Sequence, residues 1–169
     1  DQACVWIAGR PDEIAGRGDV RSAYDAAIAT SPALVRHLAD ATCVGGYRRF
    51  AGIAGFLRHP FGPGWALVGD AGYFKDPVSA HGITDAFTSA EFLADALDQA
   101  RHGDELTALA GYRDRRDELT ASLMPPVAEL AALDLEPSDA RDAWKRMSRA
   151  LRQEWDVMHS NHPPAMAVA

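Results

Sequence analysis

Apolar residues recur at helical spacing over most of the carboxyl-terminal half of the chain. The strongest period, with steps of three and four residues, predicts a helix that begins at Ser138, directly after Pro137, and buries one apolar stripe. That stripe consists of Ala140, Trp144, Met147, Leu151, Trp155 and Met158. Such a stripe ordinarily packs in a hydrophobic core, so it indicates structure and no particular chemistry.

Two further helices are predicted upstream. The first covers residues 82–101 and ends at Gly103, and the second covers residues 104–124 and is stopped by Pro125 and Pro126. The expected packing face of the first consists of Ala86, Ala90, Leu93 and Leu97, and that of the second of Leu109, Tyr112, Leu119 and Leu123. The charged residues 113–117 are expected to face water. A short apolar helix is expected over residues 127–133.

The amino-terminal third of the chain has a mixed pattern. Residues 3–8 predict a strand, residues 9–18 a loop, and two short helices are expected after Asp19 and after Ser31, whose side chains are of the N-capping type. Residues 47–53 predict a weak strand. A strand at the start of the chain needs a hydrogen-bonded neighbour, and few candidates occur before residue 63. We therefore expect its neighbour to lie outside this chain, and residues 162–169 to form a loose tail.

Composition and charge exclude several classes of protein. The 169 residues are 47% hydrophobic and 24% charged, as in an ordinary folded domain, and the net charge of −7 is spread without a basic block that could bind nucleic acid. No apolar run approaches the length of a membrane span. Cys4 and Cys43 lie outside any metal-ligand spacing, so they are expected to be small apolar fillers in a reduced, cytoplasmic protein.

One stretch of the chain carries chemistry. Residues 65–68 form a short apolar run, expected to be a fully buried strand that ends at Gly69 and Asp70, and a helix follows His81. Ligands of α/β sheets bind at this end of a strand. Asp70 could accept hydrogen bonds from sugar or ribitol hydroxyls, and the first amides of the helix would favour an anionic ligand atom.

This stretch resembles a motif of a known family. Residues 64–71, together with Pro77 and Gly82, resemble the second FAD-binding motif of the flavoprotein monooxygenases related to para-hydroxybenzoate hydroxylase, over about residues 62–97. That group also includes geranylgeranyl reductases and flavin-dependent halogenases. Residues 75–77 and 81–86 are closer to the reductases and halogenases. Many aromatic hydroxylases have Ala-Ala-His at the positions of residues 71–73, where this chain has Ala-Gly-Tyr.

The resemblance implies a set of cofactor contacts. FAD is the expected cofactor of the intact protein, with Asp70 on its ribitol or pyrophosphate side and the amides of Gly82 and Ile83 at the pyrimidine end of the flavin. Thr84 would add a contact there, and Gly69 and Pro77 belong to the same motif. NAD(P)H is a candidate reductant, and a small organic molecule is the expected substrate. No catalytic residue is assigned.

The first FAD-binding motif of the family has no counterpart here. No Gly-x-Gly-x-x-Gly turn occurs between a strand and a helix. The resemblance therefore implies an α+β fragment, mostly helical, that is the carboxyl-terminal part of an FAD/NAD(P)-binding α/β flavoprotein fold. Its expected parts are a remnant of the substrate-binding sheet (1–60), the second FAD-binding motif (61–101) and the carboxyl-terminal helices (102–169). The chain would be a natural fragment, a proteolytic remnant or one half of a split protein.

Two functions remain open on this basis. The first is a part of a FAD-dependent oxidoreductase, of monooxygenase, reductase or halogenase type, that supplies half of the flavin pocket and is inactive alone. The second is a non-enzymatic helical interaction fragment with a vestigial flavin site. The expected partner is the missing amino-terminal FAD-binding segment or a second copy of the chain.

Several single polar residues lie outside the motif or at its edge. His81 is a candidate for a role at the flavin edge. Lys75 and Asp76 are expected to form a loop ion pair, and His37, His59 and His102 are expected to face solvent.

Overall fold

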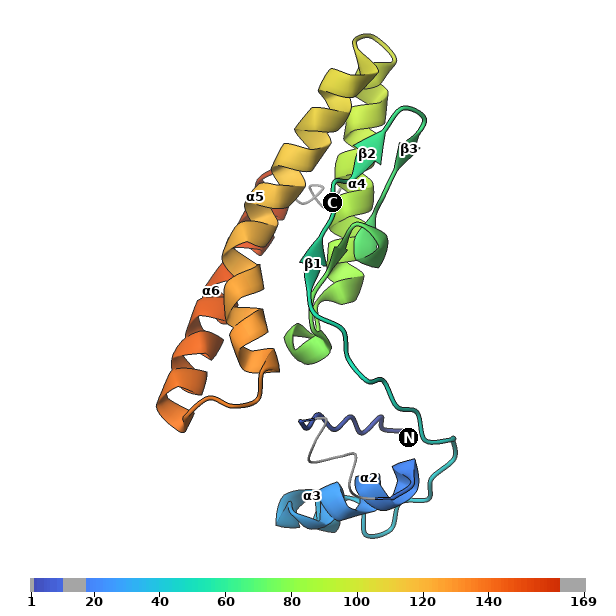
Figure 1. The fold of residues 1–169 in the computed structure, drawn as a ribbon, viewed down its shortest axis with the longest axis vertical. Coiled ribbons are helices and arrows are strands. Elements are labelled where there is room, and N and C mark those ends of the chain that lie inside the picture. The colour runs from blue at the N-terminus through green and yellow to red at the C-terminus, as the bar shows by residue number, and fades with distance from the viewer. Residues whose placement is uncertain (1, 11–17, 162–169) are drawn as a thin grey trace, which may run out of the picture. The chain divides into compact units, whose positions relative to one another are not determined.

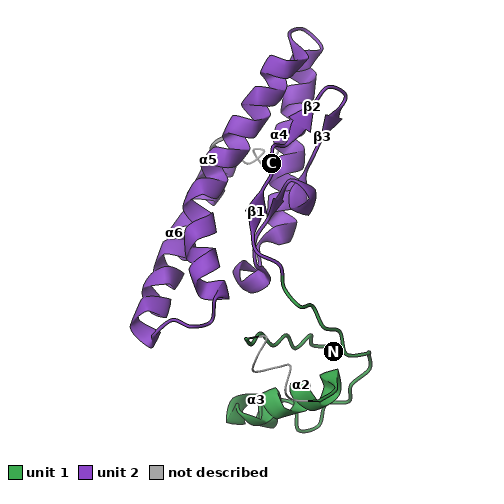
Figure 2. Ribbon diagram, viewed as in Figure 1, with its two compact units in different colours: residues 1–52 green, residues 53–169 purple. Residues whose placement is uncertain are grey.

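The computed structural model describes residues 2–10 and 18–161. They are mostly helical, with 60% helix and 5% strand, which confirms the expectation of a mostly helical chain with few strands. The chain divides into two compact units, residues 1–52 and residues 53–169 (Figures 1 and 2). Each unit is described by itself below.

The first unit contains two short helices, α2 (Val20–Ala29) and α3 (Pro32–His37). Both begin where the sequence predicted. The Asp19 carboxylate accepts a hydrogen bond from the Ser22 amide at 3.0 Å, and the Ser31 hydroxyl accepts one from the Leu34 amide at 3.4 Å. Each cap satisfies an amide that the first helical turn leaves unpaired, which explains why the boundaries could be predicted.

The predicted strands of the first unit are wrong. Residues 3–8 and 47–53 have no regular secondary structure. In this unit, no described segment pairs with either run, and extended residues without a hydrogen-bonded neighbour do not form a strand. The expected loop falls largely on residues 11–17, and the expected tail on residues 162–169, both outside the described residues.

The second unit begins with two very small antiparallel strand pairs. Strand β1 (Phe56–Leu57) pairs with β4 (Tyr73–Phe74), and β2 (Phe61–Gly62) pairs with β3 (Trp65–Ala66). The expected buried strand over residues 65–68 is therefore wrong in extent and in burial, because Trp65 is 48% exposed and Val68 is 37% exposed. Two single-turn 3₁₀ helices follow, η1 (Gly69–Ala71) and η2 (Pro77–Ser79).

Three long helices form the body of the second unit. They are α4 (Gly82–Ala100), α5 (Glu105–Ala131) and α6 (Pro137–Asn161), and α5 packs against both of the others (Figure 1). Phe92 and Ala96 of α4 pack with Tyr112 of α5. A second cluster joins α5 to α6 and consists of Leu123, Val127, Leu130, Ala143, Met147 and Ala150. Among the described residues, no helix is apolar over a length that would cross a membrane.

Helices α4 and α6 begin where predicted, but they bury different faces. The inner face of α4 consists of Asp85, Thr88, Ser89, Phe92 and Ala96. Ala90 and Leu97, which were expected to pack, are exposed. On α6, Met147 is buried as expected, but Trp144 is 48% and Trp155 is 64% exposed. Small residues at 143 and 150 pack against α5 instead, because they allow close approach of the two helices.

Helix α5 does not stop at its two prolines. It continues through Pro125 and Pro126 to Ala131, so the separate helix predicted over residues 127–133 is the end of α5. A proline inside a helix removes a hydrogen bond and costs about 3 kcal/mol. Leu123, Val127 and Leu130 are buried against α6 on both sides of this point, and that packing holds the helix together.

Candidate functional site

The residues of the flavin-like motif lie at the start of α4 and in the turns that precede it. Gly69 and Asp70 form η1, Pro77 begins η2, and Gly82, Ile83 and Thr84 form the first turn of α4. Gly69 is buried, whereas the other five residues are exposed. Asp70 therefore does not end a buried strand as expected but stands on an open turn.

Gly69 holds this turn close to α4. Its φ angle is +53°, a left-handed conformation that favours glycine, and a Cβ atom at this position would lie 3.0 Å from Cβ of Ala86. The Gly69 amide donates a hydrogen bond of 3.0 Å to the Ser89 hydroxyl. Gly69 therefore allows the turn to lie close to α4, the helix that carries the rest of the motif.

Asp70 lies beside the beginning of α4. A Cβ atom built on Gly82 would lie 3.9 Å from Oδ1 of Asp70. His81, at the N-cap position, makes no side-chain hydrogen bond to the first turn. The structure thus brings together an exposed carboxylate and helix amides with no side-chain cap, an arrangement that offers both acceptors and donors to a polar ligand.

Helix α5 anchors the turns from the other side. The Tyr112 hydroxyl donates to the carbonyl oxygen of Leu67 at 2.6 Å. Arg116 donates to the carbonyl oxygens of Arg58 at 2.8 Å and Gly72 at 3.4 Å. Arg116 was expected to face water, but its side chain is only 4% exposed. Residues within the motif are therefore fixed by hydrogen bonds from a helix that lies outside it.

Lys75 and Asp76 do not pair with each other, so that prediction is wrong. The buried ammonium of Lys75 pairs with the buried carboxylate of Asp85. Asp76 instead accepts a hydrogen bond from the Val78 amide at 2.9 Å and caps η2. Burial lowers the pKa of Lys75 to about 8, although the negative charges of Glu154 and Asp70 act in the opposite direction.

His81 connects the start of α4 to α6. Its Nε2 atom lies 3.1 Å from Oε2 of Glu154, which is 73 residues away in the sequence and is buried. His37, His59 and His102 are exposed, as predicted. Both cysteines are exposed, so the expectation that they fill apolar space is wrong.

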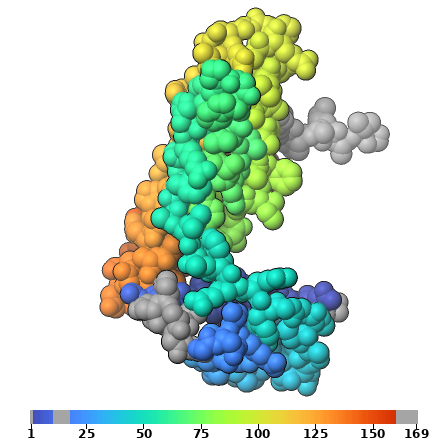
Figure 3. Space-filling model, turned by 45° about the vertical axis from the view of Figure 1, so that its right-hand side comes forward, coloured from blue at the N-terminus to red at the C-terminus, as the bar shows by residue number. Residues whose placement is uncertain are grey.

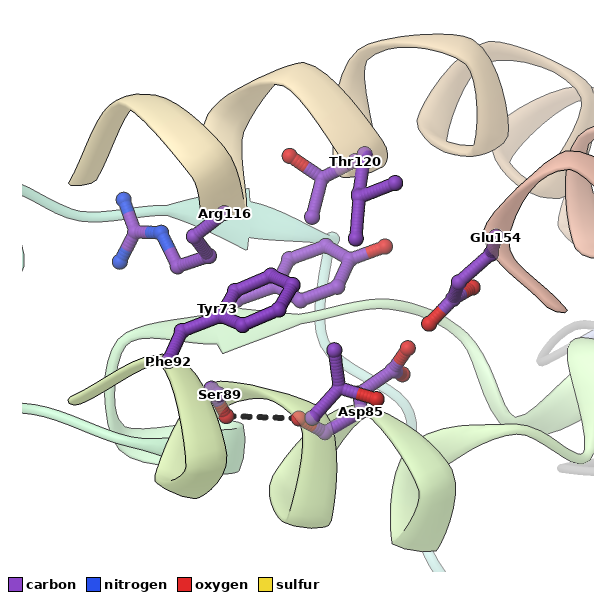
Figure 4. A pocket seen from close by; sticks show the side chains of 9 residues that line it. Tyr73, Asp85, Ser89, Phe92, Arg116, Thr120 and Glu154 are labelled. Carbon is purple, nitrogen blue, oxygen red and sulfur yellow. Dashed lines mark hydrogen bonds between the residues drawn. The ribbon is translucent and has the colours of Figure 1, made fainter. Parts of the chain in front are cut away.

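A small cavity lies between the three helices (Figure 4). Its volume is about 20 Å³. It has room for a water molecule and is far too small for a flavin. It is lined by Tyr73, Asp85, Thr88, Ser89, Phe92, Arg116, Leu119, Thr120 and Glu154. Sequence reasoning missed all of these as site residues. The available signal was a polar set at helical spacing on α4, residues 85, 88 and 89, followed by Phe92.

A second stripe of α4 is apolar and exposed. It consists of Ile83, Phe87, Ala90, Ala94 and Leu97, spaced by three or four residues. Ile83 is 78% and Phe87 is 74% exposed. The band of α4 residues is visible along one side of the second unit (Figure 3). An apolar stripe of this length that is exposed to water is typical of a face that another protein surface covers.

We expect this stripe to cause self-association or binding of an apolar dye. The double variant Ile83→Ser/Phe87→Ser should bind less dye and scatter less light than the parent at tens of micromolar, because it removes the two most exposed side chains of the stripe. Leu106→Ser on α5, a single exposed apolar residue, is the matched control. A parent chain that is monomeric and binds no dye would contradict the prediction.

Comparison with known proteins gives one informative similarity. The chain is 32% identical over 85 residues to a 1H-pyrrole-2-carbonyl-[peptidyl-carrier protein] brominase of Pseudoalteromonas luteoviolacea (strain 2ta16). The matched stretch covers 50% of this chain and 21% of that protein. No protein-family model matches the chain, and no solved structure does. The similarity is to a halogenating enzyme, in partial agreement with the resemblance found in the sequence.

Proposed function

We propose that this chain contributes part of the flavin pocket of a FAD-dependent oxidoreductase of the halogenase type. The observation that carries the proposal is the position of Asp70 beside Gly82 at the start of α4, in the order of the flavin motif. The brominase similarity supports the halogenase branch over the reductase and hydroxylase branches. Monooxygenase and reductase activities remain the neighbouring alternatives within the same class.

The residues present fit one side of a flavin nucleotide. The Asp70 carboxylate is exposed and can accept hydrogen bonds from ribitol hydroxyls, and the first amides of α4 can donate to oxygen atoms that carry negative charge. Gly82 has no side chain to separate its backbone from a ligand, and Ile83 and Thr84 follow on the same turn. When bound, FAD would supply the redox chemistry, while these residues bind and orient it.

The exposed stripe of α4 suits this role. A flavin that rests on one side of η1 and α4 must be enclosed from the other side, because an open site cannot exclude water. Ile83 and Phe87 would contact the covering surface, which we propose is the segment with the first FAD-binding motif. NAD(P)H as the reductant and a small organic substrate complete the proposal for the whole enzyme.

A flavin titration of the chain tests the proposal. FAD should bind, but more weakly than about 1 μM, because the turn that holds the ADP half is absent from the sequence. The dissociation constant of FMN should lie within a few-fold of that of FAD, because the chain lacks the turn that would hold the ADP half. Asp70→Ala should weaken both by roughly ten- to a hundredfold, since a charge-assisted hydrogen bond contributes about 1.5–3 kcal/mol.

Two controls make the titration decisive. Asp98→Ala removes another exposed carboxylate, at the far end of α4, and should leave flavin affinity unchanged. If Asp70→Ala lowers the melting temperature but not the affinity, Asp70 only stabilises its turn. A sub-micromolar dissociation constant for FAD would contradict the proposal that this chain supplies only part of the flavin pocket.

The alternative is a non-enzymatic helical interaction fragment. The exposed apolar stripe of α4 is the observation that favours it. A chain that binds neither flavin at several hundred micromolar, yet associates through Ile83 and Phe87, would support this alternative.

A further inference from the structure

Three potential metal ligands meet where α4 begins and α6 passes. His81, Asp85 and Glu154 each place one ligand atom so that all three atoms lie within 4.8 Å of one another. Asp85 and Glu154 are buried, and Nε2 of His81 is 3.1 Å from Oε2 of Glu154. Ligand atoms around a small cation lie about 3–3.5 Å apart when each bond is about 2.1 Å, so two of the three are already at that spacing.

The cluster brings charged side chains of both signs together in buried surroundings. Lys75 brings one positive charge, and Asp85 and Glu154 bring two negative charges. Arg116 also lines the cavity, but its nitrogen atoms bond to Asp117 and to two carbonyl oxygens. Two buried carboxylate groups this close repel each other, and a cation between them would relieve that repulsion.

A separate observation indicates that the adjoining cavity takes a ligand. Within the described part of the chain, the hydroxyl group of Tyr73 is buried and has no hydrogen-bond partner. Tyr73 is 5% exposed, and its hydroxyl points into the cavity on the side of Glu154 (Figure 4). Buried hydroxyls nearly always have a partner. A water bound to a cation at the cluster could donate a hydrogen bond to this oxygen.

We propose that His81, Asp85 and Glu154 bind a divalent transition-metal ion, with Zn²⁺ as the best fit. One imidazole nitrogen and two carboxylate oxygens are ligands that Zn²⁺ and Mn²⁺ accept, whereas Mg²⁺ prefers oxygen alone. Lys75 contacts Oδ2 of Asp85, which leaves Oδ1 as the ligand atom, and a water in the cavity completes the coordination. The ion would tie the first turn of α4 to α6, and the proposal does not depend on flavin binding.

The test uses the full chain after treatment with a chelator. Calorimetric titration with ZnCl₂ should show one equivalent bound, and the melting temperature should rise with the zinc concentration. MnCl₂ should act in the same way with lower affinity, and MgCl₂ should have little effect. Glu154→Gln and His81→Asn should each weaken zinc binding at least tenfold. Asparagine is a favourable residue at the start of a helix, so His81→Asn is expected to fold.

His159→Asn is the matched control. It removes an exposed imidazole from α6, about 1.4 turns beyond Glu154, and should leave the zinc affinity unchanged. Zinc binding that survives in both Glu154→Gln and His81→Asn would overturn the proposal, as would the absence of a stoichiometric site in the parent chain. Loss of binding in His159→Asn alone would place the ion elsewhere and would also overturn it.

Discussion

Replacement of Asp85 by alanine is expected to destabilise the second unit by about 3–5 kcal/mol. The side chain of Asp85 is 7% exposed and that of Lys75 is 3% exposed, so the variant leaves an ammonium group buried without its carboxylate. A solvent-exposed ion pair, in contrast, contributes only about 0.2–1 kcal/mol. Denaturant unfolding of the chain, followed by helical circular dichroism, measures the difference.

Asp95→Ala is the matched control for this prediction. Asp95 lies on the same helix and pairs with Arg115 at 2.9 Å, but both side chains are at least a third exposed. The double variant Lys75→Met/Asp85→Ala should recover part of the stability, because it removes the unpaired charge together with its partner. Equal destabilisation by Asp85→Ala and Asp95→Ala would show that the buried pair is not important for stability.

The helices were predictable because their ends carry local signals. Asp19 and Ser31 cap the helices that follow them, and Asp104 accepts a hydrogen bond from the Thr107 amide at the start of α5. Each of these contacts spans three residues and can be recognised in the sequence. The end of α5 could not be predicted, since the packing that carries it through two prolines involves residues of α6.

The buried faces were not predictable from hydrophobicity alone. Helix α4 has two candidate stripes, and the more apolar one, with Ile83 and Phe87, is exposed. The stripe that is buried contains Asp85, Thr88 and Ser89. Asp85 pairs with Lys75, and the Ser89 hydroxyl bonds both to carbonyl oxygens of α4 and to the Gly69 amide. A rule that places the most apolar face inside fails when that face has no partner among the described residues.

The flavin-like motif could be recognised in the sequence, whereas the charged cluster around Glu154 could not. The order of Gly69, Asp70 and Gly82 could be recognised because these residues are close in sequence and act largely through the backbone. Glu154 could not be connected with His81, since 73 residues separate them. The sequence therefore indicated the open surface of the site, while the structure was needed to find the charged cluster that supports it.

Arg116 is the second residue whose replacement should have a large effect. Arg116→Met keeps most of the side-chain volume but removes the donors to the carbonyl oxygens of Arg58 and Gly72, which lie at the same end of the strand pair β1 and β4. Hydrogen bonds from a charged group contribute about 1.5–3 kcal/mol each, and the bond to Gly72 is long. We expect the free energy of unfolding to fall by about 3 kcal/mol.

The predicted effect of Arg116→Met also extends to the flavin-like turn. Gly72 follows η1 directly, and its carbonyl oxygen also accepts a hydrogen bond from the Arg58 amide. Loss of the Arg116 bond should therefore increase amide hydrogen exchange at residues 69–72 modestly, before the helices unfold. Arg116→Lys should restore only part of the stability, because an ammonium group cannot reach both carbonyl oxygens in the way that the planar guanidinium does. Arg113→Met, which removes a half-exposed arginine of the same helix, should change stability by less than about 1 kcal/mol. If Arg116→Met behaved like Arg113→Met, Arg116 would not be needed to hold the turn, and the contribution of α5 would come from the hydrogen bond of Tyr112 to Leu67.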